Sequence, residues 1–415
     1  MNPITTRSND MPAPTATRNA RRPSRLFTAL LSCGLAAVAL GASNARAVSI
    51  QGGDWELDVG GIVNAYYTAT SCTGDPIASG VALAGRGLGC AGESHKTTIG
   101  NGLLPSGLIT KFKTTQEGID IGGTVGIMVH AATSSGVAPN TTVDVRQAFF
   151  TIGTADLGTL KIGRDYGIFG ANAILGDMTL LGAGAPAAAS QRGRVALGHI
   201  GAGYTYLDNY GQFSYTSPTF GGGFTFSGGV FSPVDAGLYV SKAYPQLQAQ
   251  LQYKSNGFAA WVGAKSQKFY GASGDDNPFE DDSFNEVAGE IGVSWTGGPF
   301  GLLANVQYGK GIGILSDGDQ GDVKGFNYLV QGSYMLTEKL KFGLNYGKSK
   351  NKDDTGYNDA YNLSFKSNDN LTGGLYYQLT KSVTLAGELG VTRSKDYFGN
   401  EAKQYGGDIG GIIFF

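Results

Sequence analysis

The sequence has few of the side chains on which metal sites and most catalytic centres depend. Its 415 residues include only 3 His and 3 Cys, which leaves little room for a multi-ligand metal site. Proline is scarce at 13 residues and charged residues make up 15%, so neither a collagen-like chain nor a disordered charged tail fits. Beyond residue 50 no apolar run approaches the ~18 residues of a membrane-spanning helix. These absences exclude a helical membrane protein, and we expect no metal and no cofactor.

The first 47 residues have the features of a cleaved signal peptide. Positively charged residues precede an apolar stretch at 26–41, and Ala45-Arg46-Ala47 follows as a cleavage site. Cleavage after Ala47 would make Val48 the first residue of the mature chain. Six of the 31 basic and one of the 33 acidic residues lie in this segment, so residues 48–415 carry a net charge near −7. An exported, acidic chain argues against a nucleic-acid partner.

Two cysteines, Cys72 and Cys90, remain after removal of the signal peptide, with glycine-rich sequence around and between them. The alternatives are a disulfide and two free thiols. Because an exported chain enters an oxidising compartment, we favour the disulfide.

From residue 55 onward apolar and polar residues alternate with a period of two, as β-strands require. In the run 246–254, Leu247 and Leu251 lie on one face, and Gln or Lys residues occupy the other. The same alternation recurs at 326–336, 340–346, 371–379 and 383–391. Each run has ~10 residues, enough for a tilted strand to cross the apolar core of a bilayer.

The connections between these runs are of two kinds. Seven are tight, near residues 116–118, 155–158, 218–222, 256–257, 297–300, 337–338 and 380–382. Eight are long and polar, near residues 68–105, 131–142, 165–205, 232–245, 268–283, 310–322, 351–366 and 394–404. Together they connect sixteen strands and place both chain ends on the side of the tight turns. Outer-membrane barrels have this asymmetry, since their periplasmic turns are short and their external loops long.

We therefore expect an all-β protein, a 16-stranded antiparallel transmembrane β-barrel over residues 48–415. Lipid cannot hydrogen-bond the edge of a sheet, so the sheet must close on itself. Apolar side chains would face lipid, and Gln, Asn, Ser, Thr and Lys would face the lumen. Frequent glycine, 67 residues, suits a strongly curved wall. Aromatic residues near strand ends would form interfacial girdles, for example Trp295, Phe342, Tyr346 and Tyr377. Sixteen strands leave room for an aqueous channel.

Several short motifs, read in order, resemble a known family. They are GLITKFK at 107–113, VRQAFFTIG at 145–153, LKIGRDYG at 160–167, YTSP at 215–218 with FGG at 220–222, and IIFF at 412–415. Each is weak alone, but in this order the chain resembles the general porins of Gram-negative outer membranes, especially the β-proteobacterial type. The resemblance implies a homotrimer in outer-membrane lipid and lipopolysaccharide, with a third external loop folded inward. It also implies that Phe415 is the signal read by the outer-membrane assembly machinery.

The resemblance further implies a constriction where basic wall residues face an acidic inward loop, at about 165–198. By their motifs, Arg146, Arg164 and Arg194 are similar to the basic wall positions, and Asp177 is similar to the loop acid. Lys111, Lys113 and Lys161 complete the expected pore lining. Each assignment has an alternative. Arg146 would form a structural ion pair with an adjacent strand, Asp177 would be a solvated loop acid, and Lys111 and Lys113 would lie near the lipid headgroups. Asp208 stands where many relatives carry an Arg.

The function expected is passive diffusion of small hydrophilic solutes and ions, with a preference for anions because the expected constriction is rich in cations. A substrate-selective channel is the main alternative within this class. An outer-membrane enzyme lacks a nucleophile motif beside its histidines, and an adhesin does not predict the turn and loop asymmetry. Two acidic groups, around 275–282 and 317–322, are either solvated loops or divalent-cation bridges to lipopolysaccharide.

Overall fold

The computed structural model describes residues 47–77, 79–84, 90, 93–131, 143–184, 196–274, 277–352 and 364–415. The strands are β1 (Val48–Gly52), β2 (Trp55–Gly74), β3 (His95–Gly100), β4 (Ser106–Gln116), β5 (Ile119–Val129), β6 (Val143–Thr154), β7 (Gly158–Tyr166), β8 (Asn209–Thr216), β9 (Phe224–Phe231), β10 (Tyr239–Val240), β11 (Gln246–Ser255), β12 (Phe258–Gly271), β13 (Ser283–Gly297), β14 (Phe300–Lys310), β15 (Lys324–Met335), β16 (Leu340–Asn351), β17 (Phe365–Gln378), β18 (Val383–Asp396) and β19 (Glu401–Phe414). Two short helical pieces, α2 (Ala171–Gly176) and η1 (Met178–Leu181), lie between β7 and β8. Among the described residues, no helix has the length and hydrophobicity needed to cross a membrane.

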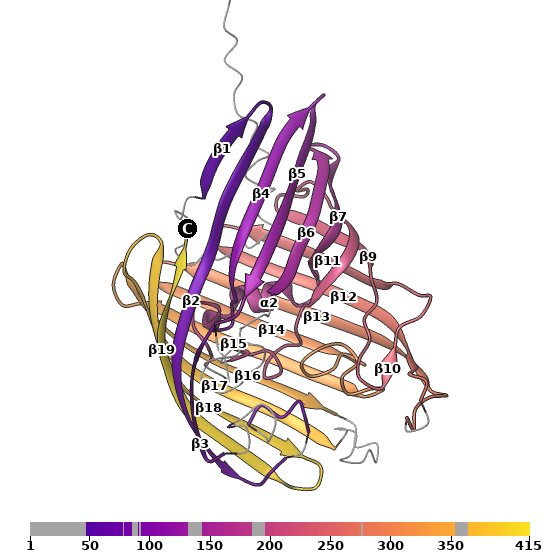
Figure 1. Ribbon diagram of the computed structural model, residues 1–415, viewed down its shortest axis with the longest axis vertical. Helices are drawn as coiled ribbons and strands as arrows, with labels where there is room; N and C mark the ends of the chain where they lie inside the picture. The colour runs from indigo at the N-terminus through magenta and orange to yellow at the C-terminus, as the bar shows by residue number, and fades with distance from the viewer. Residues whose placement is uncertain are drawn as a thin grey trace, which may run out of the picture. The chain divides into compact units, whose positions relative to one another are not determined.

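The sheet closes into a barrel of sixteen antiparallel strands, which confirms the expected fold class. Each strand pairs with its neighbour in sequence from β4 to β9 and from β11 to β19, and β9 pairs with β11 (Figure 1). Strand β2 closes the ring, because it pairs with β4 on one side and β19 on the other. The three shortest strands, β1, β3 and β10, extend the ring where a neighbour has ended. No sheet edge is left between the first and the last long strand.

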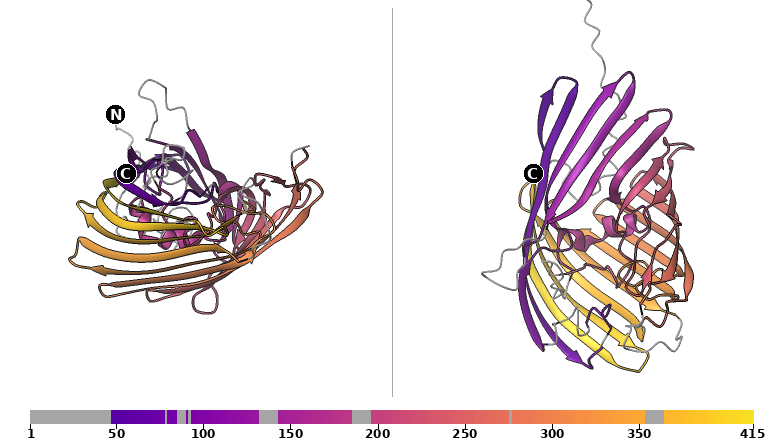
Figure 2. Two further views of the ribbon diagram at one scale, coloured as in Figure 1. Left: turned by 90° about the horizontal axis from the view of Figure 1, so that it is seen from below. Right: turned by 45° about the vertical axis from the view of Figure 1, so that its right-hand side comes forward.

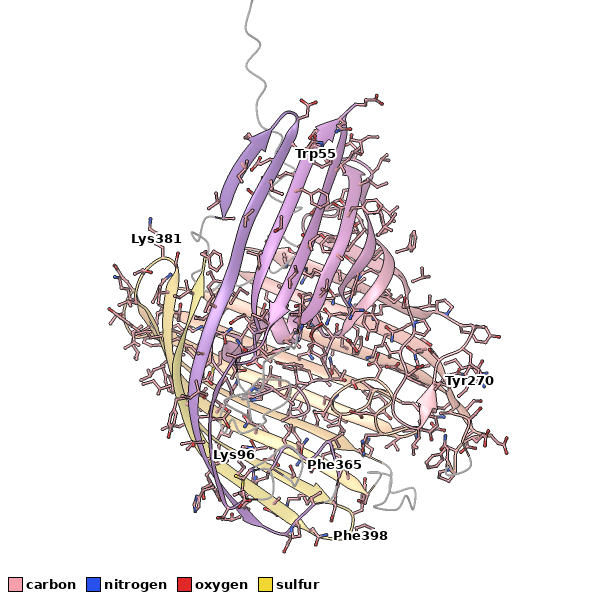
Figure 3. The ribbon with its side chains drawn as sticks, in the orientation of Figure 1. Trp55, Lys96, Tyr270, Phe365, Lys381 and Phe398 are labelled. Carbon is pink, nitrogen blue, oxygen red and sulfur yellow. A yellow bond between two sulfur atoms is a disulfide. The ribbon has the colours of Figure 1, made fainter. Side chains whose placement is uncertain are left out.

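The two ends of the barrel differ as the sequence predicts. All seven expected tight turns join consecutive strands at one end, and the turns Glu117-Gly118 and Asn256-Gly257 have positive φ at both residues. This conformation matches the twist of two-residue hairpins. Figure 3 shows Trp55 and Lys381 at the turn end, and Lys96, Tyr270 and Phe398 at the opposite end. We number the connections at that opposite end loop 1 to loop 8 in chain order.

Loop 8 is much shorter than expected. Loop 8 consists of residues 397–400 alone, because β18 continues to Asp396 and β19 begins at Glu401. An ion pair across these two strands, between Lys395 and Glu401, helps the polar residues to continue the hairpin, and Lys403 of the same strand as Glu401 also pairs with it. Polar composition alone was misleading here, because strand ends beyond the membrane are polar too.

The two faces of the wall have the reverse of a soluble protein's polarity. On β11, Leu247 is 51% exposed, whereas Gln246 and Gln248 are 0% and 3% exposed. The same inversion holds around the barrel, with exposed Ile291, Leu344 and Leu389 pointing outward. A wall that exposes apolar side chains is stable only when lipid covers it.

Aromatic side chains form two bands on this outward face. Near the turns, Phe300 and Tyr334 on adjacent strands have ring centroids 5.0 Å apart. Trp295, Phe342 and Tyr377 are exposed in the same turn-end band. Toward the loop end, the rings of Tyr328 and Tyr346 lie 6.0 Å apart. Two aromatic bands with an aliphatic zone between them mark the two interfaces of a bilayer.

Candidate functional site: the lumen and its loops

The first part of loop 3, residues 167–184, lies against inward-facing polar side chains of the wall. The backbone N–H groups of Ile168 and Phe169 donate to Gln248 Oε1 of β11 at 2.7 and 2.9 Å. The N–H of Gly170 donates to Glu290 Oε1 of β13 at 3.1 Å. Figure 1 and the right-hand view of Figure 2 draw α2 between the magenta and the orange strands, consistent with its contacts to β13 and β14. The wall's amide and carboxylate groups thus replace water as partners of this loop's backbone.

The far end of the same segment is attached to β18 by one carboxylate. Glu388 Oε2 accepts hydrogen bonds from the backbone N–H groups of Ala183 at 3.0 Å and Gly184 at 2.6 Å. The hydroxyl of Tyr376 donates to the other carboxylate oxygen at 2.5 Å. Glu388 is 1% exposed and therefore serves loop 3 rather than the solvent. The inward role of Glu388 was predictable from the sequence, because Glu388 lies in the polar phase of its strand, but Glu388 was not among the expected pore residues.

Asp177 organises the interior of loop 3. It is fully buried and accepts hydrogen bonds from the backbone N–H of Thr179 at 3.0 Å, the hydroxyl of Tyr204 at 2.7 Å and the amide of Asn345 at 3.2 Å. His199 Nδ1 lies 3.3 Å from its carboxylate. Burial raises the pKa of Asp177, but His199 and these donors outweigh burial and hold the pKa below its usual value. The expected loop acid is thus neither solvated nor exposed to the lumen.

Lys111 and Lys113 lie in the inward phase of β4, opposite to the exposed Leu108. Lys113 Nζ pairs with Glu56 at 2.7 Å and Asp58 at 3.5 Å, both on β2. Lys113 is three residues from the turn at Gln116, so this cluster belongs to the turn end of the lumen.

A β-bulge sets the position of Arg146 in β6. The pairing with β5 skips this residue, passing from Gln147 to Val145 opposite Gly126 and Ile127. A bulge re-aims a side chain out of the regular alternation. Arg146 is 6% exposed, pairs with Asp144 at 2.8 Å and donates to the hydroxyl of Tyr206 at 3.2 Å. Arg146 thus has an ion-pair partner, but Asp144 is on the same strand, whereas the alternative that we considered was an ion pair with an adjacent strand.

The other expected wall cations do not form one group with Arg146. Lys161 faces inward and pairs with Asp165 at 2.5 Å. Arg164 is exposed, shares the phase of Leu160 and Ile162 on β7, and donates to the carbonyl of Val145 at 3.1 Å. Arg194 lies outside the described residues.

The strongest inward charge cluster was missed by the sequence reasoning. Lys265 of β12 is 3% exposed and pairs with Glu286 of β13 at 3.1 Å and with Asp317 of loop 6, residues 311–323. The hydroxyl of Tyr210 donates to Asp317 at 3.1 Å. Lys265 and Glu286 occupy the polar phase of their strands, which was the available signal. A loop acid and a strand cation are brought together only by the fold.

The acidic residues of loop 6 also have roles within the fold. Asp319 accepts backbone N–H bonds from Ile314 at 2.8 Å, Leu315 at 2.7 Å and Ser316 at 3.1 Å. Burial raises its pKa to about 6 despite these donors. Asp322 pairs with Lys310 at 2.7 Å. Neither a solvated loop nor a divalent-cation bridge describes Asp317 and Asp319.

Cys72 and Cys90 are joined by a disulfide, with their Cα atoms 6.0 Å apart. Cys72 lies in the inward phase of β2, and Cys90 is 2% exposed. The bond therefore attaches loop 1 to the lumen side of the wall.

Comparisons with known proteins agree with this architecture. The family model of the Gram-negative porins matches residues 34–397. None of the curated protein sequences matches. Among solved structures, the outer-membrane channel DcaP of Acinetobacter baumannii is similar with a TM-score of 0.65 at 15% identity, covering 88% of this chain and 99% of that one. The anion-selective porin from Comamonas acidovorans has a TM-score of 0.61 at 18% identity, covering 87% and 100%. OmpF of Salmonella typhi has a TM-score of 0.57 at 16% identity, covering 89% and 100%.

At these identities the solved structures establish the fold, and the family match establishes the membership. The matched segment includes most of the sixteen strands, and the wall has an apolar outside and a polar inside. This chain belongs to the Gram-negative porin family and forms a channel in the outer membrane.

Proposed function

We propose that the channel passes small hydrophilic solutes and ions by passive diffusion and carries out no catalysis. The observation that carries this proposal is the closed sixteen-stranded wall with a polar inward face, because sixteen strands enclose more space than the wall's own side chains fill. The family and the fold are those of channels.

Loop 3 is the proposed constriction. Its contacts with β11, β13 and β18 support an inward course along the far wall, and Arg146, Lys161 and Lys111 line the wall of β4 to β7. Solutes would pass between these two surfaces. Asp177 would shape the loop from within rather than present a charge to the solute.

We propose a smaller anion preference than the count of cations in the sequence would suggest. Arg146, Lys161 and Lys113 each have a carboxylate partner, so each contributes less net positive charge to the lumen than an unpaired cation would. The positive charge expected at Arg194 would add to theirs, whereas Arg164 lies in the outward phase of β7. We therefore propose a small anion preference set by the remaining positive charge of Arg146, Lys161 and Lys113 together with Arg194.

Three further proposals concern export and assembly. Val48, the proposed first residue of the mature chain, is also the first residue of β1. Phe415, the proposed assembly signal, exchanges backbone hydrogen bonds with Gly61 of β2 at 2.8 and 3.1 Å, next to the last strand pairing.

A homotrimer is the proposed assembly, supported by the likeness to the trimer form of OmpT from Vibrio cholerae, with a TM-score of 0.51 at 12% identity. Size-exclusion chromatography with light scattering in detergent tests the trimer.

Liposome swelling tests the proposed function. Purified wild-type protein in liposomes should admit sugars at rates that fall with increasing sugar size, without saturation. Protein denatured by boiling before reconstitution is the control and should admit none. Folded protein that admits no sugar would contradict the proposal. A rate that saturates with one solute, while others of similar size remain slow, would favour the substrate-selective channel.

A further inference from the structure

Loop 1, residues 75–105 between β2 and β4, is attached to the inward face of strands far from it in sequence. The backbone N–H of Leu83 donates to Asn368 Oδ1 of β17 at 3.1 Å, and the N–H of Ala84 donates to Ser394 Oγ of β18 at 2.9 Å. Cys90 forms a disulfide with Cys72 of β2, and its Sγ lies 3.6 Å from the hydroxyl oxygen of Thr70. The described residues 83, 84 and 90 of loop 1 are thus attached to the inner side of the wall where the chain's first and last long strands meet.

Apolar side chains of loop 1 are buried against the wall at the loop end of the barrel rather than solvated. Ile77 and Ala82 are 0% exposed and pack in one cluster with Ile314 of loop 6 and Phe365 of β17. Figure 3 shows Phe365 toward the loop end of the barrel. An apolar cluster at this position excludes water from part of the lumen, because its side chains pack against each other.

Asn368 connects loop 1 to loop 3. Its side-chain amide donates to the carbonyl of Val81 in loop 1 and to the carbonyl of Gly201 in loop 3, both at 2.9 Å. The amide is fully buried, and its oxygen accepts from Leu83 and from Ser394. All its hydrogen-bonding groups are therefore used to hold two loops against one point of the wall.

We propose that loop 1 is a second constriction element of the channel, held in the lumen by the Cys72–Cys90 disulfide and positioned by Asn368. The free cross-section is then set by two loops, and loop 1 restricts the size of solutes on the side of β17 to β19 and β2. This inference rests on the proposed diffusion channel and adds a specificity determinant outside loop 3.

Single-channel conductance and sugar entry test the proposal with three variants. The double variant Cys72→Ser/Cys90→Ser should raise the conductance roughly 1.5- to 2-fold and admit larger sugars, since conduction depends on the open cross-section. Asn368→Ala should shift both in the same direction by a smaller factor. Asn305→Ala is the matched control: Asn305 is a buried inward asparagine of β14 whose side-chain oxygen accepts from the indole N–H of Trp261 on β12, and it should change neither.

Combining the variants tests whether Asn368 acts by positioning loop 1 or through another part of the channel. If Asn368 acts through loop 1, adding Asn368→Ala to the double cysteine variant should change conductance much less than it does in the wild type. Equal effects in both backgrounds would assign Asn368 to loop 3 alone and overturn its role in loop 1.

The outcomes distinguish this inference from the proposed function. Wild-type protein that is folded but does not conduct would contradict the channel itself. Wild-type channels that conduct, with a folded double cysteine variant of equal conductance and equal sugar limit, would overturn the role of loop 1 alone. If the variant does not fold, a reductant is added to wild-type channels already in a bilayer, with maleimide labelling to verify reduction. Labelled channels of unchanged conductance would then overturn the proposal.

Discussion

The outward and inward faces of this wall are built on different physical principles. The outward face exposes single apolar side chains such as Ile291 and Leu344, each of which interacts with lipid largely on its own. The inward face is a network, in which Lys265, Glu286 and Asp317 come from three separate parts of the chain. Substitutions outside should therefore have additive effects governed by transfer into lipid, whereas substitutions inside should depend on which partner remains.

The largest effect is expected where the inward network loses its central cation. Lys265→Met leaves Glu286 and Asp317 buried without their shared partner and should lower the free energy of unfolding by about 3–5 kcal/mol. Lys395→Met, which removes a half-exposed lysine paired with Glu401, should cost less than about 1 kcal/mol. Denaturant unfolding of both variants in lipid vesicles measures the difference. Equal losses would mean that the buried network is no more stabilising than a surface pair.

The outward face should reject a charge near the middle of a strand. Ile291→Lys places an ammonium group in the lipid and should cost about 2–4 kcal/mol. Gln252→Lys puts the same group on the half-buried inward face of β11 and should cost clearly less. Unfolding in the same vesicles compares the two. A greater loss for the inward lysine would reverse the assignment of faces on these strands.

Asp319 of loop 6 should give the interior of the barrel a pH dependence that the outward face lacks. The pKa of Asp319 is raised to about 6, so the folded state holds its proton above the pH at which the unfolded chain loses it. Stability from this group is therefore fully present below about pH 4 and falls as the pH rises through 6, by about 1–3 kcal/mol. Unfolding at pH 4 and pH 7 should show this fall in the wild type and a smaller one in Asp319→Asn. An identical pH dependence in both would contradict the assignment.

Arg146 and Arg164, each from one of the motifs that resemble the porin family, test the assignment of the two faces through ion selectivity rather than stability. Arg146→Gln removes an inward cation and should shift the reversal potential toward cations. Arg164→Gln removes an exposed side chain in the outward phase of its strand and should shift it less. Reversal potentials under a KCl gradient provide the measurement. A larger shift for Arg164 would place that side chain nearer the ion path than Arg146.

The barrel could be predicted from the sequence because alternation and turn residues are local signals. Runs such as 246–254 show both faces of a strand directly, and the tight turns separate them. The lumen network could not be predicted to the same depth, because its pairs join residues such as Lys265 and Asp317 that only the closed fold brings together. Arg146 illustrates the limit, since its position depends on a bulge that shifts the alternation by one residue. The length of loop 8 was overestimated, because polar residues that continue a strand cannot be told by residue type from polar residues of a loop.

The proposed function depends on a polar, water-filled lumen inside this apolar wall. Single-channel recording of purified, folded wild-type protein in a planar bilayer under a KCl gradient tests for this lumen. We expect discrete, uniform steps of conductance, in groups of three if the proposed trimer inserts as a unit, with a small reversal potential in the direction of anions. Silence from protein shown to be folded by its heat-modifiable migration would contradict the proposed function.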